Sequence, residues 1–399
     1  MKRIIALSAA LMMLLAGCGN KAKEQTSSSD GSEWRLVSTY DMYEKEKHGC
    51  FIIDTTGRLD FLDFETMENT PLCNNAACKH EPPKGAESER NENICPAYGK
   101  NNHPFLYEDK LYYFKSSDFE QRDDGLLSQG IQLWKCDIGG GNEKQLAEIK
   151  GLTIQSYNKC LLTECKLWAL LNNEAIAPDN VTRPSHHELV CFDLKTGEYK
   201  NYGAVSQDHY SAGSYIFGMW EGKLIFQCSY SKDDRPFTEG LHEYAQKHAL
   251  TDTEAMGEYT ATIEFINSYF EADLSSGEVA VLDKPEPLLI TEKGYYYIDN
   301  GRLKCLKKDG KTLDLAAIDN VDIQYLGGGL FYRNGEKSFL LNEDTYEQTQ
   351  IAVGDNTPLW AYSDELIYMQ TRDIIDEQTG MVIDTVTEYI KKPISELVE

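Results

Sequence analysis

A short strand motif recurs seven times along this 399-residue chain and constrains the fold more than any other feature. Each copy is a polar turn followed by a run of Leu, Ile or aromatic residues, a pattern typical of strands buried on both faces. The last copies are 35 and 36 residues apart, close to the length of one propeller blade. The copies are Cys50-Phe51-Ile52-Ile53, Leu111-Tyr112-Tyr113-Phe114, Leu167-Trp168-Ala169-Leu170, Leu224-Ile225-Phe226-Gln227, Tyr295-Tyr296-Tyr297-Ile298, Leu330-Phe331-Tyr332 and Leu366-Ile367-Tyr368-Met369.

A second element follows most copies of the motif. It is an apolar strand that ends in Asp and leads into a tight turn with Gly four residues further on. The Asp side chain can cap such a turn, and Gly adopts the positive φ that the turn needs, so the element predicts a hairpin. The clearest examples are Asp137 with Gly141, Asp193 with Gly197 and Asp273 with Gly277.

One buried strand and one such hairpin form a unit that cannot cover both of its faces alone, so neighbouring units must stack and close a ring. The pattern therefore predicts an all-β fold, a β-propeller over residues 34–399. Seven blades are expected, with six or eight as alternatives and a β-sandwich as the competing fold. We expect a strand from Trp34 to Tyr43 to pair with the last blade, at Val382 to Lys391, and close the ring. A helix is expected near Leu241 to Leu250.

The first 17 residues have the features of a signal peptide. Lys2 and Arg3 precede an apolar stretch that is too short to span a bilayer as a helix. It ends in Leu15-Ala16-Gly17-Cys18, which resembles the lipobox of bacterial lipoproteins. The resemblance implies cleavage before Cys18 and a thioether-linked diacylglycerol on Cys18. The alternative is an ordinary secretory signal with an incidental cysteine.

Residues 18–33 are small, polar and rich in Ser, which predicts a flexible tether. Two acyl chains anchor a protein stably, so we expect the chain on the extracellular face of the cell membrane, attached through its N-terminal lipid. The chain has 39 Lys and Arg against 65 Asp and Glu, a net charge of −26. This balance argues against nucleic acid as a partner, because binding its phosphates needs a basic face.

The cysteines carry the chemical signal of the sequence. Between residues 71 and 98 the spacing is Cys73-x4-Cys78-x-His80-x14-Cys95. Three thiolates and one imidazole form a tetrahedral set suited to zinc, and four protein ligands would make the zinc structural. Disulfides are the main alternative, because ten cysteines remain after Cys18 and extracellular disulfides persist. Free thiols are the third possibility. If these cysteines formed disulfides, His80 would have no role in the segment.

The other cysteines and histidines carry weaker signals. Cysteines in strand-like stretches are expected to be small buried side chains, although Cys160 and Cys165 flank a turn and could pair across a hairpin. We expect His186-His187, His242 and His248 to be solvated rather than to bind a ligand.

The lipobox, the diffuse blade pattern and the Leu-Cys…Cys-x-His…Cys segment together resemble the uncharacterised β-propeller lipoproteins of Gram-positive, clostridia-like bacteria. The resemblance covers nearly the whole mature chain, with its specific part in the Cys/His insert at 73–100. It implies an extracellular, lipid-anchored propeller. The sequence signatures of WD40 and sialidase propellers are missing, and there is only one Gly-Gly start of the kelch type, at Gly327-Gly328-Gly329.

No motif assigns catalytic residues. Gly-x-Ser-x-Gly, P-loop and Gly-x-Gly-x-x-Gly patterns are all missing from the sequence. The leading hypothesis is a surface-anchored, non-catalytic binding or scaffold propeller that takes a glycan or a protein through loops at 73–100, 172–187 and 231–260. The second is an extracellular carbohydrate-active enzyme with a carboxylate pair in the central funnel. The third is an envelope component whose Cys₃His site is only structural.

Overall fold

The contacts divide the chain into two compact units, Met1–Ser32 and Glu33–Glu399, and the fold concerns the second. The computed structural model describes residues 34–38, 49–54, 56–83, 95–155, 158–176, 185–206, 208–209, 213–233, 235–318, 321–326, 329–354, 356–362, 364–375 and 382–398.

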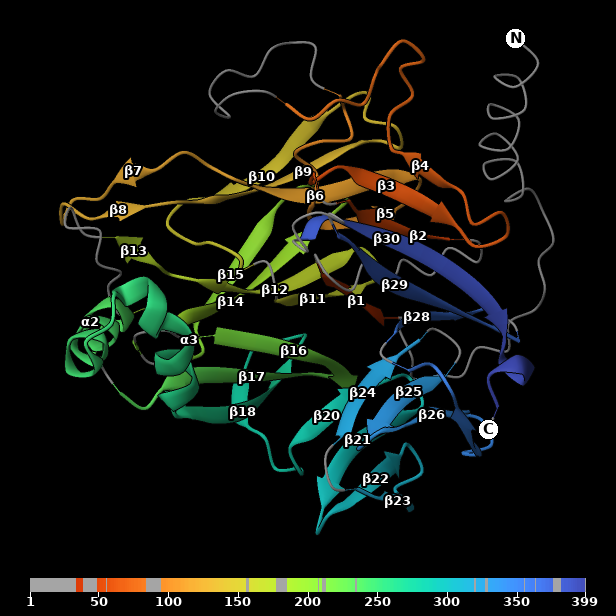
Figure 1. Ribbon diagram of the computed structural model, residues 1–399. Coiled ribbons are helices and arrows are strands. Elements are labelled where there is room, and N and C mark those ends of the chain that lie inside the picture. Colours follow the sequence, from red (N-terminus) through yellow and green to blue (C-terminus); the bar gives the residue numbers. More distant parts are fainter. Residues whose placement is uncertain are drawn as a thin grey trace. The chain divides into compact units, whose positions relative to one another are not determined.

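Seven antiparallel sheets follow one another along the described chain as the blades of a β-propeller, which confirms the predicted fold class and the preferred blade number (Figure 1). Each sequence motif lies in a strand, and in blades two to seven that strand is the second of its blade.

From the first blade to the seventh, the strands of the ring are β2 (Gly49–Ile53), β3 (Leu59–Asp63) and β4 (Asn69–Pro71); β5 (Asn102–Tyr107), β6 (Lys110–Ser116), β9 (Ile131–Asp137) and β10 (Lys144–Ile149); β11 (Lys159–Thr163), β12 (Lys166–Asn172), β14 (His187–Asp193) and β15 (Tyr199–Ala204); β16 (Gly213–Trp220), β17 (Lys223–Ser231), β18 (Phe265–Asp273) and β19 (Val279–Val281); β20 (Pro287–Ile290), β21 (Gly294–Asp299), β22 (Arg302–Lys307) and β23 (Thr312–Ala317); β24 (Val321–Tyr325), β25 (Leu330–Asn334), β26 (Lys337–Leu341) and β27 (Gln348–Ile351); and β28 (Thr357–Tyr362), β29 (Glu365–Ile375) and β30 (Val382–Pro393).

The Asp-type turns join the last two strands of their blades. In the third blade, Asp193 Oδ1 accepts hydrogen bonds from the amides of Lys195 and Thr196 at 2.9 and 3.0 Å. The Gly197 amide then donates to the Asp193 carbonyl at 2.8 Å, with φ at 79° for Gly197. Asp63, Asp273 and Asn342 cap equivalent turns, so this repeat in the sequence is a repeat in the structure.

Seven buried apolar clusters each lie between two neighbouring blades, which is the packing expected of a closed ring. One pair of large residues represents each cluster, in ring order: Leu59 and Tyr113, Phe114 and Phe192, Trp168 and Phe226, Trp220 and Tyr295, Tyr296 and Tyr332, Phe331 and Leu366, and Trp360 and Phe64. The last cluster joins the seventh blade to the first, where the Lys391 ammonium also donates to the Phe64 carbonyl at 3.0 Å. Packing of side chains therefore closes the ring.

The N-terminal strand does not pair with the last blade, so that prediction is wrong. β1 (Trp34–Ser38) pairs antiparallel with β11, the first strand of the third blade, from Trp34 opposite Thr163 to Ser38 opposite Lys159. It also contacts β5 and β16, the first strands of the adjacent blades. Because first strands line the axis of a propeller, β1 lies inside the ring. Residues 39–43 of the predicted strand lie outside the described residues.

Three insertions leave the ring between the second and third strands of consecutive blades. The second blade carries an arm with β7 (Glu120–Gln121) and β8 (Leu127–Ser128), and β13 (Ala175–Ile176) of the third blade pairs with β8. The fourth blade carries α2 (Phe237–His248), which confirms the expected helix, and α3 (Asp252–Thr262), which was not expected. All three lie on one side of the ring (Figure 1).

The end of the described chain has little helix. A 3₁₀ turn, η2 (Ile394–Glu396), follows β30, and Val398 then bridges back to Ile351 of the sixth blade. In the part of the chain that the structure covers, neither helix combines the length and apolarity that crossing a membrane requires.

Candidate metal centre

The four predicted metal ligands lie together where the first blade meets the second. The connection between these blades begins after β4, and both of its described parts are fastened to the first residue of β3. The Leu72 amide donates to the Leu59 carbonyl at 3.0 Å, and the Leu59 amide donates to the Ala97 carbonyl at 2.9 Å. These bonds hold Cys73 and Cys95, which neighbour the fastened residues in sequence, on the same edge of the blade.

Local turns give each ligand its direction. The Cys78 amide donates to the Asn75 carbonyl at 3.0 Å, while the Asn75 side chain accepts from the Ala77 amide, so the chain reverses before Cys78. His80 has a positive φ of 56°, and its backbone amide faces Cys78 Sγ while its ring faces Cys95 Sγ. A turn from Cys95 to Tyr98, closed by a 3.0 Å hydrogen bond, presents the last ligand.

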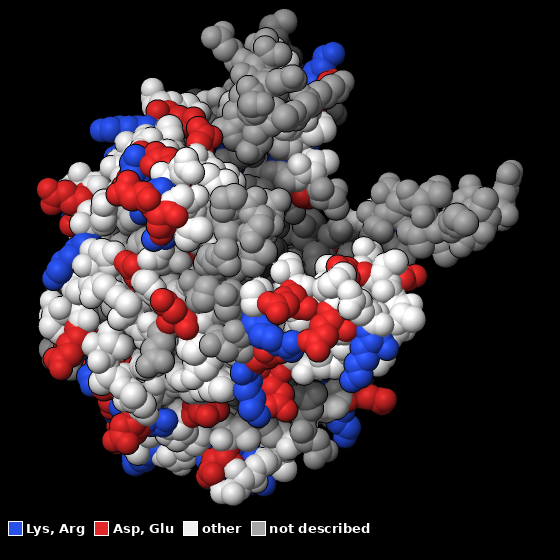
Figure 2. Space-filling view, turned by 90° about the vertical axis from the view of Figure 1, so that its left-hand side faces the viewer, with Lys and Arg blue, Asp and Glu red and all other residues white. Residues whose placement is uncertain are grey.

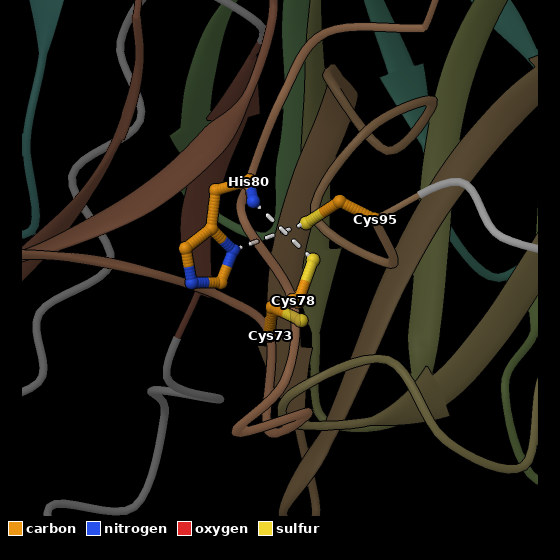
Figure 3. A group of neighbouring side chains, drawn as sticks. All are labelled: Cys73, Cys78, His80 and Cys95. Atoms are coloured by element: carbon orange, nitrogen blue, oxygen red, sulfur yellow. Dashed lines mark hydrogen bonds between the residues drawn. The ribbon is translucent and has the colours of Figure 1, made fainter.

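The ligand atoms converge on one point. The sulfur atoms of Cys73, Cys78 and Cys95 and a ring nitrogen of His80 all lie within 4.8 Å of one another. His80 Nδ1 is 3.4 Å from Cys95 Sγ, and the four side chains point toward each other from separate stretches of chain (Figure 3). Zinc at roughly 2.3 Å from sulfur and 2.0–2.1 Å from nitrogen sets tetrahedral ligand atoms about 3.5–3.8 Å apart. The cluster therefore has the donors and the spacing to hold a metal such as zinc.

The thiols differ in how readily they ionise. Cys95 is buried, and burial raises the pKa of its thiol to about 12. The His80 amide approaches Cys78 Sγ at 3.4 Å and lowers the pKa of that thiol. A bound cation would favour the thiolate at both positions, because metal binding displaces the thiol protons.

A second layer of contacts holds the centre against the second blade. The Tyr98 hydroxyl donates to the His80 carbonyl at 3.2 Å and lies 3.0 Å from Thr56 Oγ1. The Asn74 amide reaches the Gly139 carbonyl, in the turn between β9 and β10, at 3.3 Å. A Cβ on Gly140 of the same turn would lie 2.2 Å from Pro96 Cβ. The centre therefore joins two blades.

Other predicted positions have mixed outcomes. The described cysteines outside the centre are thiols that take part in no disulfide, and all of them except Cys165 are buried. Cys160 and Cys165 therefore do not pair. His187 is fully buried in β14, so the expectation that it is solvated is wrong, whereas His186 is partly exposed and pairs with carboxylates. Cys18 lies outside the described residues.

The central funnel offers little to a carboxylate pair. Among the described residues of β1, β5, β11, β16, β20, β24 and β28, which line the axis, Asp322 is the only Asp or Glu. β1 also occupies the space inside the first strands of the second, third and fourth blades. These strands therefore give no support to hydrolysis by two carboxylates in the funnel, which needs both groups on either side of one bond.

Comparisons with known proteins reveal fold similarity only. No family profile and no curated protein matches the chain. A putative 6-phosphogluconolactonase from Bacteroides fragilis is 13% identical with a TM-score of 0.32, over 93% of this chain and 98% of that one. An oligogalacturonate lyase in complex with manganese is 14% identical with a TM-score of 0.35, over 69% and 79%. Dipeptidyl peptidase 4 from Porphyromonas gingivalis is 10% identical with a TM-score of 0.39, over 89% and 59%. Scores this low carry no argument about activity.

Proposed function

We propose that the protein is a lipid-anchored binding propeller of the extracellular cell surface, whose ligand contacts the side that carries the three insertions. The placement of the insertions carries this proposal. The arm, β13 and the helical hairpin all leave at the end of the ring where second strands finish. At the other end of the same blades the turns have two residues each, Glu108-Asp109, Glu164-Cys165 and Glu221-Gly222. Propellers bind partners through loops gathered on one side.

The charges on the insertion side suit a ligand that is not strongly charged. Figure 2 looks onto this side and shows Asp and Glu side chains dispersed over it, with Lys and Arg among them. Several of these charges are paired with each other. Lys150 pairs with Glu120 at 2.8 Å, and Lys232 pairs with Glu264 at 2.5 Å.

The direction of β1 shows at which end of the ring the described chain begins. Trp34 lies at the short-turn end of the ring and Ser38 at the insertion end, because β1 runs antiparallel to β11. In our proposal the diacylglycerol on Cys18 and the tether at 18–33 precede this strand, so the chain joins the ring at the end away from the insertions.

We assign the Cys/His centre a structural zinc. Cys73, Cys78, His80 and Cys95 form a closed set of four protein ligands, which leaves no position for a substrate. The described residues that follow His80 are Glu81, Pro82 and Pro83, which bring little apolar surface to bury. In this proposal the bound metal orders the connection, because the burial of apolar side chains cannot do so.

Photo-crosslinking on whole cells tests the binding side. A benzoyl-phenylalanine at Phe119 of the arm or at Phe265 at the start of β18, both about half exposed, is expected to crosslink to envelope material. The same probe at Lys195 or Ser276, in the Asp-type turns, is the control and is expected to remain uncrosslinked. Equal crosslinking from both sides, or from neither, would contradict the proposal.

Detergent partition tests the anchor. The wild-type chain is expected in the detergent phase, and Cys18→Ala is expected in the aqueous phase, because two acyl chains supply the attachment. Retention of Cys18→Ala in the detergent phase would exclude Cys18 as the anchor.

A further inference from the structure

A groove lies at the outer edge of the junction between the second and third blades, under the arm. It measures about 980 Å³, which is at the upper end of the roughly 300–1,000 Å³ of small-molecule sites, and it is open to solvent. The end of β10 and the residues after it form one wall, and β14 and β15 form the other. The arm is held over the groove by two hydrogen bonds from the Lys150 ammonium to the Glu120 carboxylate, at 2.8 and 2.9 Å.

The wall formed by β14 and β15 has polar groups fixed in place. Glu188 accepts hydrogen bonds from His186 Nε2 at 3.0 Å and from the Asn201 amide. Asn201 Oδ1 in turn accepts from the Gly203 backbone amide at 2.8 Å, so both the oxygen and the nitrogen of that side chain are held. The Asn173 amide lies 3.4 Å from His186. Glu188, Asn201 and Asn173 line the groove and supply carboxylate and amide groups as hydrogen-bond donors and acceptors.

An aromatic ring lies on the same wall. Tyr199 is 45% exposed and lines the groove, and it lies opposite the buried Phe192 in the register of β15 and β14. The two ring centroids are 6.2 Å apart, so the core supports the exposed ring. A flat aromatic ring beside fixed carboxylate and amide groups suits a ligand that has an apolar C–H face and polar edges.

The charges in the groove argue against an ionic ligand. Five carboxylates line it, which repel an anionic polymer. Most of them already have partners: Glu120 pairs with Lys150, Asp124 with Arg122, and Glu188 with His186. Glu148 accepts from the amides of Gln132 and Gln145. Few unpaired carboxylates therefore remain in the groove to bind a cation.

We propose that this groove binds a neutral oligosaccharide, whose ring faces stack on Tyr199 while its hydroxyls pair with Glu188, Asn201 and Asn173. This inference rests on the proposed binding function and names its ligand class. The open groove and its volume suit a short run of sugar rings rather than a single enclosed one. The arm would form the far side of the site, through Gln121 and Asp123.

Calorimetry with tetrasaccharides of defined charge tests this inference. The probes are neutral tetramers of glucose, mannose, galactose and N-acetylglucosamine, the cationic deacetylated N-acetylglucosamine tetramer, and an anionic galacturonate tetramer. At least one neutral tetramer is expected to bind, with an affinity that changes little with salt. Tyr199→Ala should weaken that binding roughly tenfold.

Two further variants make the result specific. Asn201→Ala should also weaken binding, whereas Ile298→Ala, which shortens a similarly exposed apolar side chain outside the groove, should not change it. Binding of only the cationic tetramer, or of no neutral one, would overturn the inference, as would equal effects of Tyr199→Ala and Ile298→Ala. In those cases crosslinking from Phe119 and Phe265 would still report on the proposed binding side independently.

Discussion

The junction between the first and second blades differs at its outer edge from the junction between the second and third. At the first, the chain after β4 runs against the turn between β9 and β10, and the Cys/His centre fills the outer edge. At the second, the chain after β10 runs beside the start of β15, and the outer edge is left as a groove. The repeat is the same, and the length and content of the connection decide what occupies the edge. A long connection with cysteines can form a metal centre, and a short one leaves room for a ligand.

The comparison also separates two ways to hold a blade. Apolar clusters hold every pair of neighbouring blades, and the largest contribution to stability should come from them. The Cys/His centre, by contrast, orders only the connection between the first and second blades. Polar pairs such as His186 with Glu188 shape the groove and contribute little to stability, because exposed ion pairs are weak.

The largest effect is expected where a buried apolar cluster joins the seventh blade to the first. Trp360, 8% exposed, packs against Phe64 with ring centroids 6.0 Å apart. Trp360→Ala should lower the free energy of unfolding by about 3–5 kcal/mol, because it leaves a cavity in a buried cluster. Denaturant unfolding with and without a zinc chelator measures this, and the loss should be the same in both. A loss that depends on the chelator would mean that the two kinds of junction are coupled.

Two glycines in equivalent turns allow the metal centre and the groove to be compared directly. A Cβ at Gly140 would lie 2.2 Å from Pro96 Cβ at the metal centre, and one at Gly197 would lie 2.9 Å from the Leu146 carbonyl oxygen beside the groove. Both residues have positive φ, at 93° and 79°. Gly140→Ala and Gly197→Ala should each cost about 1–3 kcal/mol. Only Gly140→Ala should also lower metal content, because it displaces the residue next to Cys95. Equal metal content in both would place the centre elsewhere.

Losing the metal should loosen one connection and leave the blades folded. His80→Ala or chelation is expected to raise the rate of proteolytic cleavage within 72–101 roughly tenfold, as a local opening. The connection from Lys150 to Gln155 should be cleaved no faster, since it has no metal ligand. Limited proteolysis with mass mapping shows the sites. Uniform cleavage across the chain would mean that the metal supports the whole ring.

The smallest effect is expected from pH at the groove. Burial disfavours the charged form of His186, but its hydrogen bonds with Asp208 and Glu188 outweigh this and raise its pKa above 6.5. The pair therefore contributes fully below about pH 6.5, and its contribution is lost as the pH rises through the raised pKa. The change should stay below about 1 kcal/mol, because the groups are partly exposed. Unfolding curves from pH 5 to 9 for the wild type and His186→Gln test it. Parallel curves would show that this pair does not titrate with folding.

Local patterns in the sequence predict most of the ring. The second strands of the blades are uniform apolar runs such as Leu167 to Leu170, and the Asp–Gly turns are read from two residues. The first strands of the blades are not predicted from apolar runs, because they mix apolar residues with Pro, Gly and polar residues, as in Asn102–Tyr107. α3 had a readable signal that was missed: Thr251 and Glu254 form a capping box.

Contacts between distant residues are harder to predict from the sequence. The pairing of Trp34 with Thr163 spans more than a hundred residues, and nothing in Trp34–Ser38 specifies which blade it joins. The groove likewise combines side chains from β7, β10, β14 and β15, none of which forms a motif in sequence. The Cys/His centre was predictable because its four ligands lie within one connection and their residue types identify them.

Metal analysis with thiol counting on the purified protein shows directly whether Cys73, Cys78, His80 and Cys95 form a structural zinc centre. We expect one zinc per chain, lost in His80→Ala, and ten titratable thiols after the metal is removed, at the cysteines from Cys50 to Cys305. A protein with no bound metal and two thiols fewer would rule out the zinc centre, because it would mean that a disulfide fastens this connection.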